Sequence, residues 1–259
     1  MINRIKMQKK LIIIAQIGVF IGVLILWEIG AKVGLLDEFL FSSPSAIFKL
    51  LVQYISSNQI WRHLFISILE TVLGIIFGTS LGIILAIILW SNKFLSKIME
   101  PFLVLLNALP KTALAPIMII WAGTGVSGIV VVSISILIVV TIISTYNHFI
   151  NVDSEKVRML KSFGATKTQL FSKLIFPSNL VNIINVIKIN IGLAWVGVIV
   201  GEFLVSRAGL GYLIMYGGQV FRLDLVMMGV VVLCLVAYLM YALVNLLEKI
   251  LIKKRGKRI

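Results

Sequence analysis

The sequence has little of what most redox and metal-binding proteins need. Its 259 residues include one cysteine and two histidines, and these residues, Cys234, His63 and His148, lie far apart along the chain. A single cysteine forms no disulfide within a chain, and two distant histidines do not have the spacing of zinc ligands. We therefore expect no metal site and no cofactor bound by this chain.

Catalytic motifs are equally scarce. Residues 78–82 spell G-T-S-L-G, which matches the nucleophile elbow of hydrolases, but that chemistry requires a strand, a turn and a nearby histidine. Here the five residues lie inside a long apolar run. Residues 164–168, G-A-T-K-T, lack the frame of a phosphate-binding P-loop. The chain is thus predicted not to be an enzyme and not to hydrolyse ATP itself.

Charged residues are few, whereas apolar residues are abundant. The chain is 60% hydrophobic with a mean hydropathy of +1.09, against about 45–50% apolar residues in soluble domains. A membrane-spanning helix needs about 20 apolar residues, and the apolar runs do not alternate as barrel strands do. We therefore predict an all-α, polytopic membrane protein. Its six transmembrane helices are expected at 11–31, 63–90, 98–121, 127–149, 179–205 and 225–251.

The 24 basic residues outnumber the 10 acidic ones, but their distribution argues against a nucleic-acid partner. With the N-terminus assigned to the cytoplasm, 17 of them fall inside, five outside and two within spans. The five outer residues are Lys32, Lys49, Arg62, Arg207 and Arg222. Such an excess of inner basic residues is the positive-inside pattern, so both termini are predicted to be cytoplasmic. The basic ends are expected to meet anionic lipid headgroups.

The chain is expected to form one domain, because only short loops separate the spans. Residues 1–62 are interpreted as a cytoplasmic tail, the first transmembrane helix and an outer loop. The apolar core Leu11–Trp27 is long for a signal peptide, which favours an uncleaved anchor. Residues 63–251 are interpreted as a five-helix core with a cytoplasmic loop at 150–178, and residues 252–259 as a basic tail.

The segment Asp153–Pro177 carries five basic residues between apolar runs, so it must face water. Asp153 is a predicted N-cap, and Gly164 is expected to end the helix. Thr166 and Gln169 are placed to form a capping box that opens a second helix, and Pro177 is expected to close the loop. The first helix has an apolar face, which needs a surface to dock against.

This loop resembles the cytoplasmic loop of ABC-importer permeases, whose motif is written E-A-A-x3-G-x9-I-x-L-P. Gly164 and Pro177 stand at the family's spacing, with Leu174 and Phe176 at its Ile and Leu positions. The E-A-A triplet is replaced by residues 158–160. The resemblance implies that the loop helix contacts the ATPase subunit. The expected contact residues are Glu155, Met159, Leu160, Phe163, Gly164 and Ala165.

Four further segments resemble the nitrate, sulfonate and taurine branch of these permeases. They are residues 41–45, F-S-S-P-S; 67–74, S-I-L-E-T-V-L-G; 110–125, which begins P-K-T-A-L-A-P; and 192–211. Glu70 departs from the pattern, because the branch has an arginine there. The matches occur in the expected order and, with the loop, cover roughly residues 40–250.

The resemblance implies a type I ABC importer permease fold in a bacterial cell membrane. The expected partners are a second permease copy, giving a homodimer, two ATP-binding subunits that hold ATP and Mg, and an extracytoplasmic substrate-binding protein. Transport would proceed by alternating access. The cargo would be a small solute, such as a nitrate-, sulfonate- or taurine-like anion or a related small molecule.

Polar residues within predicted spans are candidates for the transport pathway. Trp195, Ile199 and Glu202 recur at helical spacing, so they share one face of the fifth span. Gly209 and Gly211 follow in a turn that is expected to act as an outer gate. Other expected contacts join Glu202 to Arg207 and Glu70 to Lys111, while Lys188 is expected to snorkel or to face the pore.

Small residues predict close helix packing. Gly74, Gly78 and Gly82 recur every fourth residue, and Ala86 continues the row. In a membrane such a stripe lets another helix approach closely. Gly197 and Gly201 form a second, shorter case.

Two functions of other classes remain as alternatives. A polytopic membrane enzyme would need a polar catalytic cluster within the spans, and the sequence offers none. A secondary transporter predicts inverted repeats and broken helices. Pro110 and Pro116 could break a helix, but no second half of the chain mirrors them.

Overall fold

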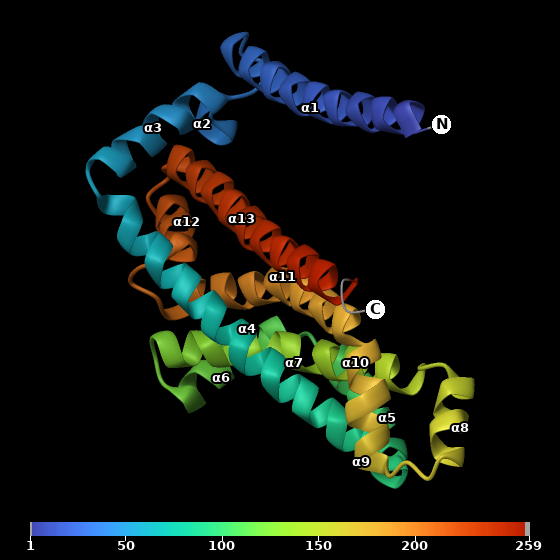
Figure 1. Ribbon diagram of the computed structural model, residues 1–259. Helices are drawn as coiled ribbons and strands as arrows, with labels where there is room; N and C mark the ends of the chain where they lie inside the picture. The colour runs from blue at the N-terminus through green and yellow to red at the C-terminus, as the bar shows by residue number, and fades with distance from the viewer. Residues whose placement is uncertain (1, 257–259) are drawn as a thin grey trace. The chain divides into compact units, whose positions relative to one another are not determined.

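The computed structural model describes the backbone of residues 2–256 and the side chains of residues 11, 12 and 14–250. The basic residues predicted to meet lipid at 4–10 and in the tail at 252–259 therefore lie outside the described side chains. Within the described range every regular element is a helix (Figure 1). The chain forms two compact units, Met1–Arg62 with Leu213–Val232, and His63–Tyr212 with Leu233–Ile259.

The first unit folds the predicted outer loop into helices. Its first three helices are α1 (Ile2–Lys32), α2 (Glu38–Phe41) and α3 (Pro44–Ser56). Asp37 caps α2, and Ser43 caps α3 ahead of a proline in the first turn, as favoured at helix starts. Trp27 donates a hydrogen bond to the Ser42 carbonyl at 3.2 Å, and Glu28 accepts one from the Ser45 backbone at 3.0 Å. These bonds attach the segment after α1 to α1 itself.

The second unit contains most of the apolar helices. Its elements in chain order are α4 (Gln59–Ser91), α5 (Lys93–Ala108), η1 (Lys111–Leu114), α6 (Ala115–Ala122), α7 (Val126–Ile150), α8 (Ser154–Ser162), α9 (Lys167–Leu170), η2 (Phe171–Ile175), α10 (Phe176–Ser178) and α11 (Leu180–Val205). Two helices complete the chain, α12 (Leu210–Gln219) and α13 (Leu223–Gly256). α4, α12 and α13 each have residues in both units.

Five helices of the described chain are long and apolar enough to cross a membrane. They are Ile14–Lys32, Gln59–Ser91, Val126–Ile150, Leu180–Val205 and Leu223–Ile250. A sixth span exists if the bent pair Lys93–Ala108 and Lys111–Ala122 counts as one. The predicted all-α, polytopic fold is therefore confirmed, with the third span bent rather than straight.

The bend in the third span lies at Leu109 and Pro110. The two helical parts meet at 81°, and Leu109 between them has an extended backbone, with φ −65° and ψ 134°. A residue before proline is pushed toward this conformation, and proline itself supplies no backbone N–H to continue the helix. The span expected over 98–121 is thus made of two helices, and the break lies at Pro110, one of the two prolines that the sequence offered as helix breakers.

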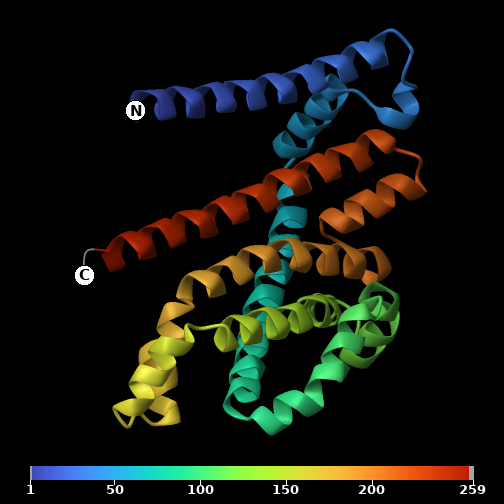
Figure 2. The ribbon, with the colours of Figure 1, turned by 90° about the vertical axis from the view of Figure 1, so that its right-hand side faces the viewer.

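Small residues bring α4 and α11 against α7, as predicted for the glycine stripe. A Cβ atom added to Gly74, Gly78 or Gly82 would lie 2.4, 2.1 or 2.6 Å from the α7 side chains of Ser133, Leu137 and Thr141. Gly197 and Gly201 on α11 make the same kind of approach, with added Cβ atoms 2.5 and 3.0 Å from Ser133 and Ile129. The side-by-side course of α7 and α11 is visible in Figure 2. The sequence did not identify the partner helix; it is α7.

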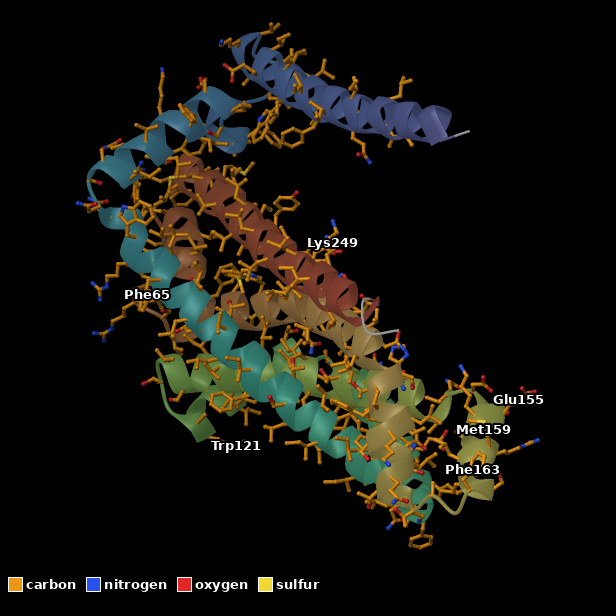
Figure 3. All side chains as sticks on the ribbon, viewed as in Figure 1. Phe65, Trp121, Glu155, Met159, Phe163 and Lys249 are labelled. Carbon is orange, nitrogen blue, oxygen red and sulfur yellow. The ribbon has the colours of Figure 1, made fainter. Side chains whose placement is uncertain are left out.

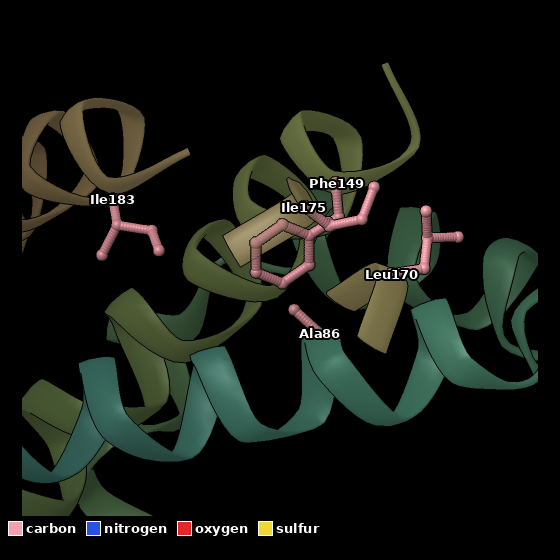
Figure 4. Packing of buried hydrophobic residues seen from close by; sticks show 5 residues of the cluster. All are labelled: Ala86, Phe149, Leu170, Ile175 and Ile183. Atoms are coloured by element: carbon pink, nitrogen blue, oxygen red, sulfur yellow. The ribbon is translucent and has the colours of Figure 1, made fainter. Parts of the chain in front are cut away.

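A buried apolar cluster lies where the chain turns from α7 into the loop. It joins Ala86 of α4, Phe149 of α7, Leu170, Ile175 and Ile183 (Figure 4). Phe149 is the largest of these side chains and is almost completely buried, so it removes more apolar surface from water than any other single member. This cluster fixes the loop helices to the transmembrane helices.

Candidate functional site

The loop between α7 and α11 has the two capped helices that the sequence predicts. Asp153 accepts a hydrogen bond from the Glu155 backbone at 2.9 Å, and α8 ends at Ser162. Gly164 follows with φ +76°, a conformation that glycine adopts without a Cβ penalty. Thr166 and Gln169 then form the predicted capping box, with hydrogen bonds of 3.3 and 2.9 Å. Both helix starts and the glycine turn are confirmed.

The apolar residues of α8 divide between two surroundings. Val157 and Leu160 are half-buried and pack against the Phe149 cluster. Met159 and Phe163 are 53% and 80% exposed. Figure 3 labels Met159 and Phe163 with Glu155 on this helix. The apolar face predicted for docking thus packs partly inside the subunit. Its exposed part, Met159 and Phe163, remains available for docking.

After the turn at Gly164, the return to the membrane is helical from Lys167 to Ser178. α9 passes into a π-helical turn at Phe171–Ile175 and then into α10, which contains Pro177. Phe171 contacts the rings of Trp90, Phe149 and Phe176, with centroids 5.1, 5.5 and 5.8 Å away. Pro177 stands just before α11, as expected, but it lies within a helical turn near a helix start, where its missing N–H costs little. This aromatic group was not predicted from the sequence.

At the other end of the same unit, Glu202 of α11 lies in a ring of hydrogen-bond donors. The Ser67 hydroxyl of α4 donates to its Oε1 at 2.5 Å, and the Gly211 backbone donates to its Oε2 at 2.5 Å. The Ser67 hydroxyl in turn accepts from the Leu210 backbone at 2.7 Å. Glu202 is only 1% exposed. A buried carboxylate requires such partners, so this ring fixes α4, α11 and the start of α12 to one another.

The turn at Gly209 is tightly packed rather than open. Gly209 has φ +128°, and an added Cβ would lie 2.3 Å from the Glu202 carboxyl group. Its carbonyl and its N–H lie 3.1 and 3.0 Å from His63 Nδ1. The flexible turn expected at Gly209 and Gly211 is thus held by side chains of α4 and α11. Their role as an outer gate stays a prediction.

Glu70 lies beside Glu202, contrary to the pairs expected from the sequence. Glu70 is 1% exposed, and its Oε2 has no hydrogen-bond partner among the described residues. Lys111, the expected partner of Glu70, donates instead to the Asn107 carbonyl at 3.4 Å. Arg207, the expected partner of Glu202, lines a pocket of about 500 Å³ together with Glu70. Neither expected ion pair occurs among the described residues; the acid that neighbours Glu70 is Glu202.

Polar contacts also join the helices deeper in the unit. The Asn190 amide of α11 donates to the hydroxyl groups of Thr79 and Thr141, at 2.8 Å each. These two residues belong to α4 and α7, so one side chain links three helices. Such bonds between membrane helices contribute about 0.6 kcal/mol each on average. The sequence interpretation missed Asn190, although an asparagine inside an apolar run was a usable signal.

Lys188 is paired with α13. Its ammonium group forms an ion pair with Glu248 and donates to the Asn245 side chain at 3.1 Å. The ring of Tyr241 lies 5.9 Å away. A charged group within a membrane span requires this kind of compensation. The lysine expected to snorkel or to face the pore thus contacts α13.

The predicted pathway residues of α11 differ in exposure. Trp195 and Glu202 are buried, whereas Ile199 between them is half-buried. The indole N–H of Trp195 has no acceptor within the described chain. Across the described residues, no three His, Cys, Asp or Glu side chains lie close enough to hold a metal ion.

Comparison with known proteins places this arrangement in a family. Residues 78–257 match the family described as binding-protein-dependent transport system inner membrane component. Among the relatives is SsuC of Bacillus subtilis (strain 168), named for transport of aliphatic sulfonates, 30% identical over 90% of this chain and 85% of its own. The formylaminopyrimidine permease ThiX of Halalkalibacterium halodurans is 28% identical over 92% and 95%. The taurine permease TauC of Escherichia coli K12 is 25% identical over 87% and 84%.

Solved structures share the fold at low sequence identity. A bacterial ABC transporter involved in import of the polysaccharide alginate matches with a TM-score of 0.67 and 14% identity, over 93% of this chain and 96% of its own. The methionine transporter MetNI in inward-facing conformations matches with a TM-score of 0.56 and 16% identity, over 76% and 96%.

The family has consequences for the competing interpretations. A membrane enzyme and a self-sufficient secondary transporter are both set aside, because members of this family are transport subunits whose ATPase is a separate chain. The family also implies an ATPase partner, a binding-protein partner and a multi-pass location in the inner membrane. The chain belongs to the binding-protein-dependent inner membrane components and is the transmembrane permease subunit of an ABC importer.

Proposed function

We propose that this permease moves a small organic anion of the sulfonate type, delivered by an external binding protein, by alternating access. The observation that carries the proposal is the 30% identity to a permease named for aliphatic sulfonates, which extends over 90% of this chain. A heterocyclic cargo is the second candidate, since a formylaminopyrimidine permease matches over a similar length.

Uptake by the complete transporter distinguishes the two candidates. The permease, its ATPase and its binding protein are reconstituted in vesicles, and accumulation of labelled taurine, an alkylsulfonate and an aminopyrimidine is measured with and without ATP. We expect ATP-dependent accumulation of a sulfonate. Accumulation of the aminopyrimidine alone would replace the sulfonate proposal with the second candidate.

The assembly we propose contains two copies of this chain and two ATPase subunits, which bind ATP and Mg. α8 would dock on the ATPase through Glu155, Met159 and Phe163, with Gly164 and Ala165 in the turn behind them. Burying an exposed Met or Phe contributes about 1.5–3 kcal/mol each. Leu160, also predicted at this contact, would act mainly as the anchor of α8. Native mass spectrometry of the purified complex tests the stoichiometry.

The pathway is proposed to run along the face of α11 that carries Trp195, Ile199 and Glu202, with Gly209 and Gly211 near its outer end. Ile199 is its half-buried member, whereas the adjacent Val198 is fully buried. A thiol reagent should therefore modify an Ile199→Cys variant and block uptake, whereas a Val198→Cys variant should remain unmodified. If both cysteines were equally protected from the reagent, this face of α11 would not line the pathway.

Both termini are proposed to be cytoplasmic, on the distribution of basic residues. In a Cys234→Ser background, a membrane-impermeant thiol reagent added to intact cells should modify Ser57→Cys. It should modify Thr168→Cys only after the membrane is permeabilised. Both positions are exposed, so access to the reagent depends on the side of the membrane. Labelling of Thr168→Cys in intact cells, with Ser57→Cys protected, would reverse the orientation.

A further inference from the structure

The pocket of about 500 Å³ lies in the second unit, where α7 begins and α11 ends. It is lined by Ile66 and Glu70 of α4, by residues 124–126 and Ile129 at the start of α7, and by residues 205–208 at the end of α11. A volume of this size is that of a site for a small molecule. Most of the lining is apolar, and the two side chains that can carry charge are Glu70 and Arg207.

The inner wall of the pocket carries an acid that lacks a partner. Glu70 is 1% exposed, and its Oε2 accepts no hydrogen bond from any described residue. Ser67, one turn earlier on α4, donates to a second buried acid, Glu202, and helix residues three apart are neighbours. A buried acceptor without a donor is costly, and a buried acid requires a positive partner. The inner wall therefore favours a ligand group that donates hydrogen bonds and carries positive charge.

The mouth of the pocket offers donors to an anion. Arg207 is exposed and forms no ion pair with any described residue, and an arginine fork can bond two oxygen atoms of an acidic group at once. Beside it, α7 begins at Val126 with Gly125 as its N-cap and with no side-chain cap. The first N–H that bonds back to this cap is that of Ile129. The N–H groups before it are free to bind an anion.

We propose that this pocket binds the cargo as a zwitterion, with its acidic head at Arg207 and the start of α7 and its ammonium group at Glu70. An aminoalkanesulfonate carries these two groups at the ends of a short carbon chain, which the apolar lining would contact. A simple alkylsulfonate would leave Glu70 without a donor and would bring a negative charge toward buried acids. The inference rests on the proposed function, because it narrows a sulfonate cargo to an aminosulfonate.

Protection of a cysteine at the pocket tests the site. Thr124 lines the pocket and is exposed, so a Thr124→Cys variant in a Cys234→Ser background reports occupancy. The permease–ATPase complex is purified without the binding protein, and modification by a thiol reagent is timed at increasing concentrations of taurine or of ethanesulfonate. We expect taurine to protect at a concentration at least about tenfold lower, because only taurine supplies a charged donor to Glu70. Ser57→Cys, exposed and outside the pocket lining, should be protected by neither.

Two variants assign the two ends of the ligand. Glu70→Gln removes the acid at nearly the same volume, so the preference for taurine over ethanesulfonate should be lost. Arg207→Gln removes the fork that holds the acidic head, so protection by both sulfonates should weaken. The control Glu38→Gln, which changes an exposed acid of α2, should behave as the parent. The comparison of the two sulfonates in the parent still decides the proposal if Glu70→Gln fails to insert.

The outcomes separate this inference from the proposed function. Equal protection of position 124 by the two sulfonates, protection by neither, or an unchanged preference in an inserted Glu70→Gln variant would overturn the zwitterion site. The proposed function would still stand if the complete transporter accumulates a sulfonate in vesicles. Protection by taurine without accumulation of any sulfonate would instead leave the pocket as a zwitterion site and refute the proposed cargo.

Discussion

A Gly164→Trp substitution is expected to abolish ATP-driven uptake while the permease still inserts in the membrane. Gly164 has φ +76° and open space around the position of a Cβ atom. Any L side chain is strained in this conformation, by about 1–2 kcal/mol. Tryptophan adds a large ring next to Phe163, the exposed apolar residue that directly follows α8. The substitution should distort the turn and the docking surface together. Vesicles should therefore lose uptake, while the ATPase activity should become independent of transport.

A Gly164→Asn variant is the matched control. Asparagine tolerates the left-handed conformation better than other residues, and its side chain is small, so most of the uptake should remain. Gly164→Ala should lie between the two, because it strains the turn without covering the docking surface. Full coupled activity in Gly164→Trp, with normal binding of the ATPase, would contradict docking at this surface.

The sequence was sufficient to predict the loop because its local signals agree with one another. Each signal is a contact or backbone conformation that involves only neighbouring residues: the N-cap at Asp153, the turn at Gly164 and the Thr166–Gln169 capping box. The structure has all three as predicted. The path after Leu170 was predicted less well. There the helix is held by the Phe171 ring against Trp90 and Phe149, contacts between residues far apart in sequence.

The acids near the start of α12 illustrate the same limit. Opposite charges were the natural partners for Glu70 and Glu202, and the sequence offered Lys111 and Arg207. The choice depends on how α4 and α11 pack on α7, because this packing brings Ser67 and Glu70, three residues apart on α4, toward Glu202. The glycine stripe predicted a close approach but carried no information about which helix fills it.

The close approach of α11 to α7 leads to the second prediction of a large effect. Gly197→Ala on α11 is expected to destabilise the subunit, because the added Cβ would lie 2.5 Å from the Ser133 Cα and 3.1 Å from its backbone N. A backbone cannot rotate away as a side chain can, so α11 and α7 must separate. Overpacking of this kind costs about 1–3 kcal/mol. Separation would also stretch the bond from the Ser133 hydroxyl to the Ala194 carbonyl, now 3.2 Å. Gly197→Leu should prevent folding altogether.

Gly192 provides the comparison on the same helix. An added Cβ there meets nothing within 4 Å, so Gly192→Ala should be neutral or slightly stabilising, since alanine favours a helix by about 1 kcal/mol over glycine. The midpoint of thermal unfolding in detergent should therefore fall for Gly197→Ala and stay level or rise for Gly192→Ala. Helix propensity changes equally in both variants, so the difference between them isolates the contact with α7. Equal midpoints would mean that α11 and α7 do not pack through Gly197.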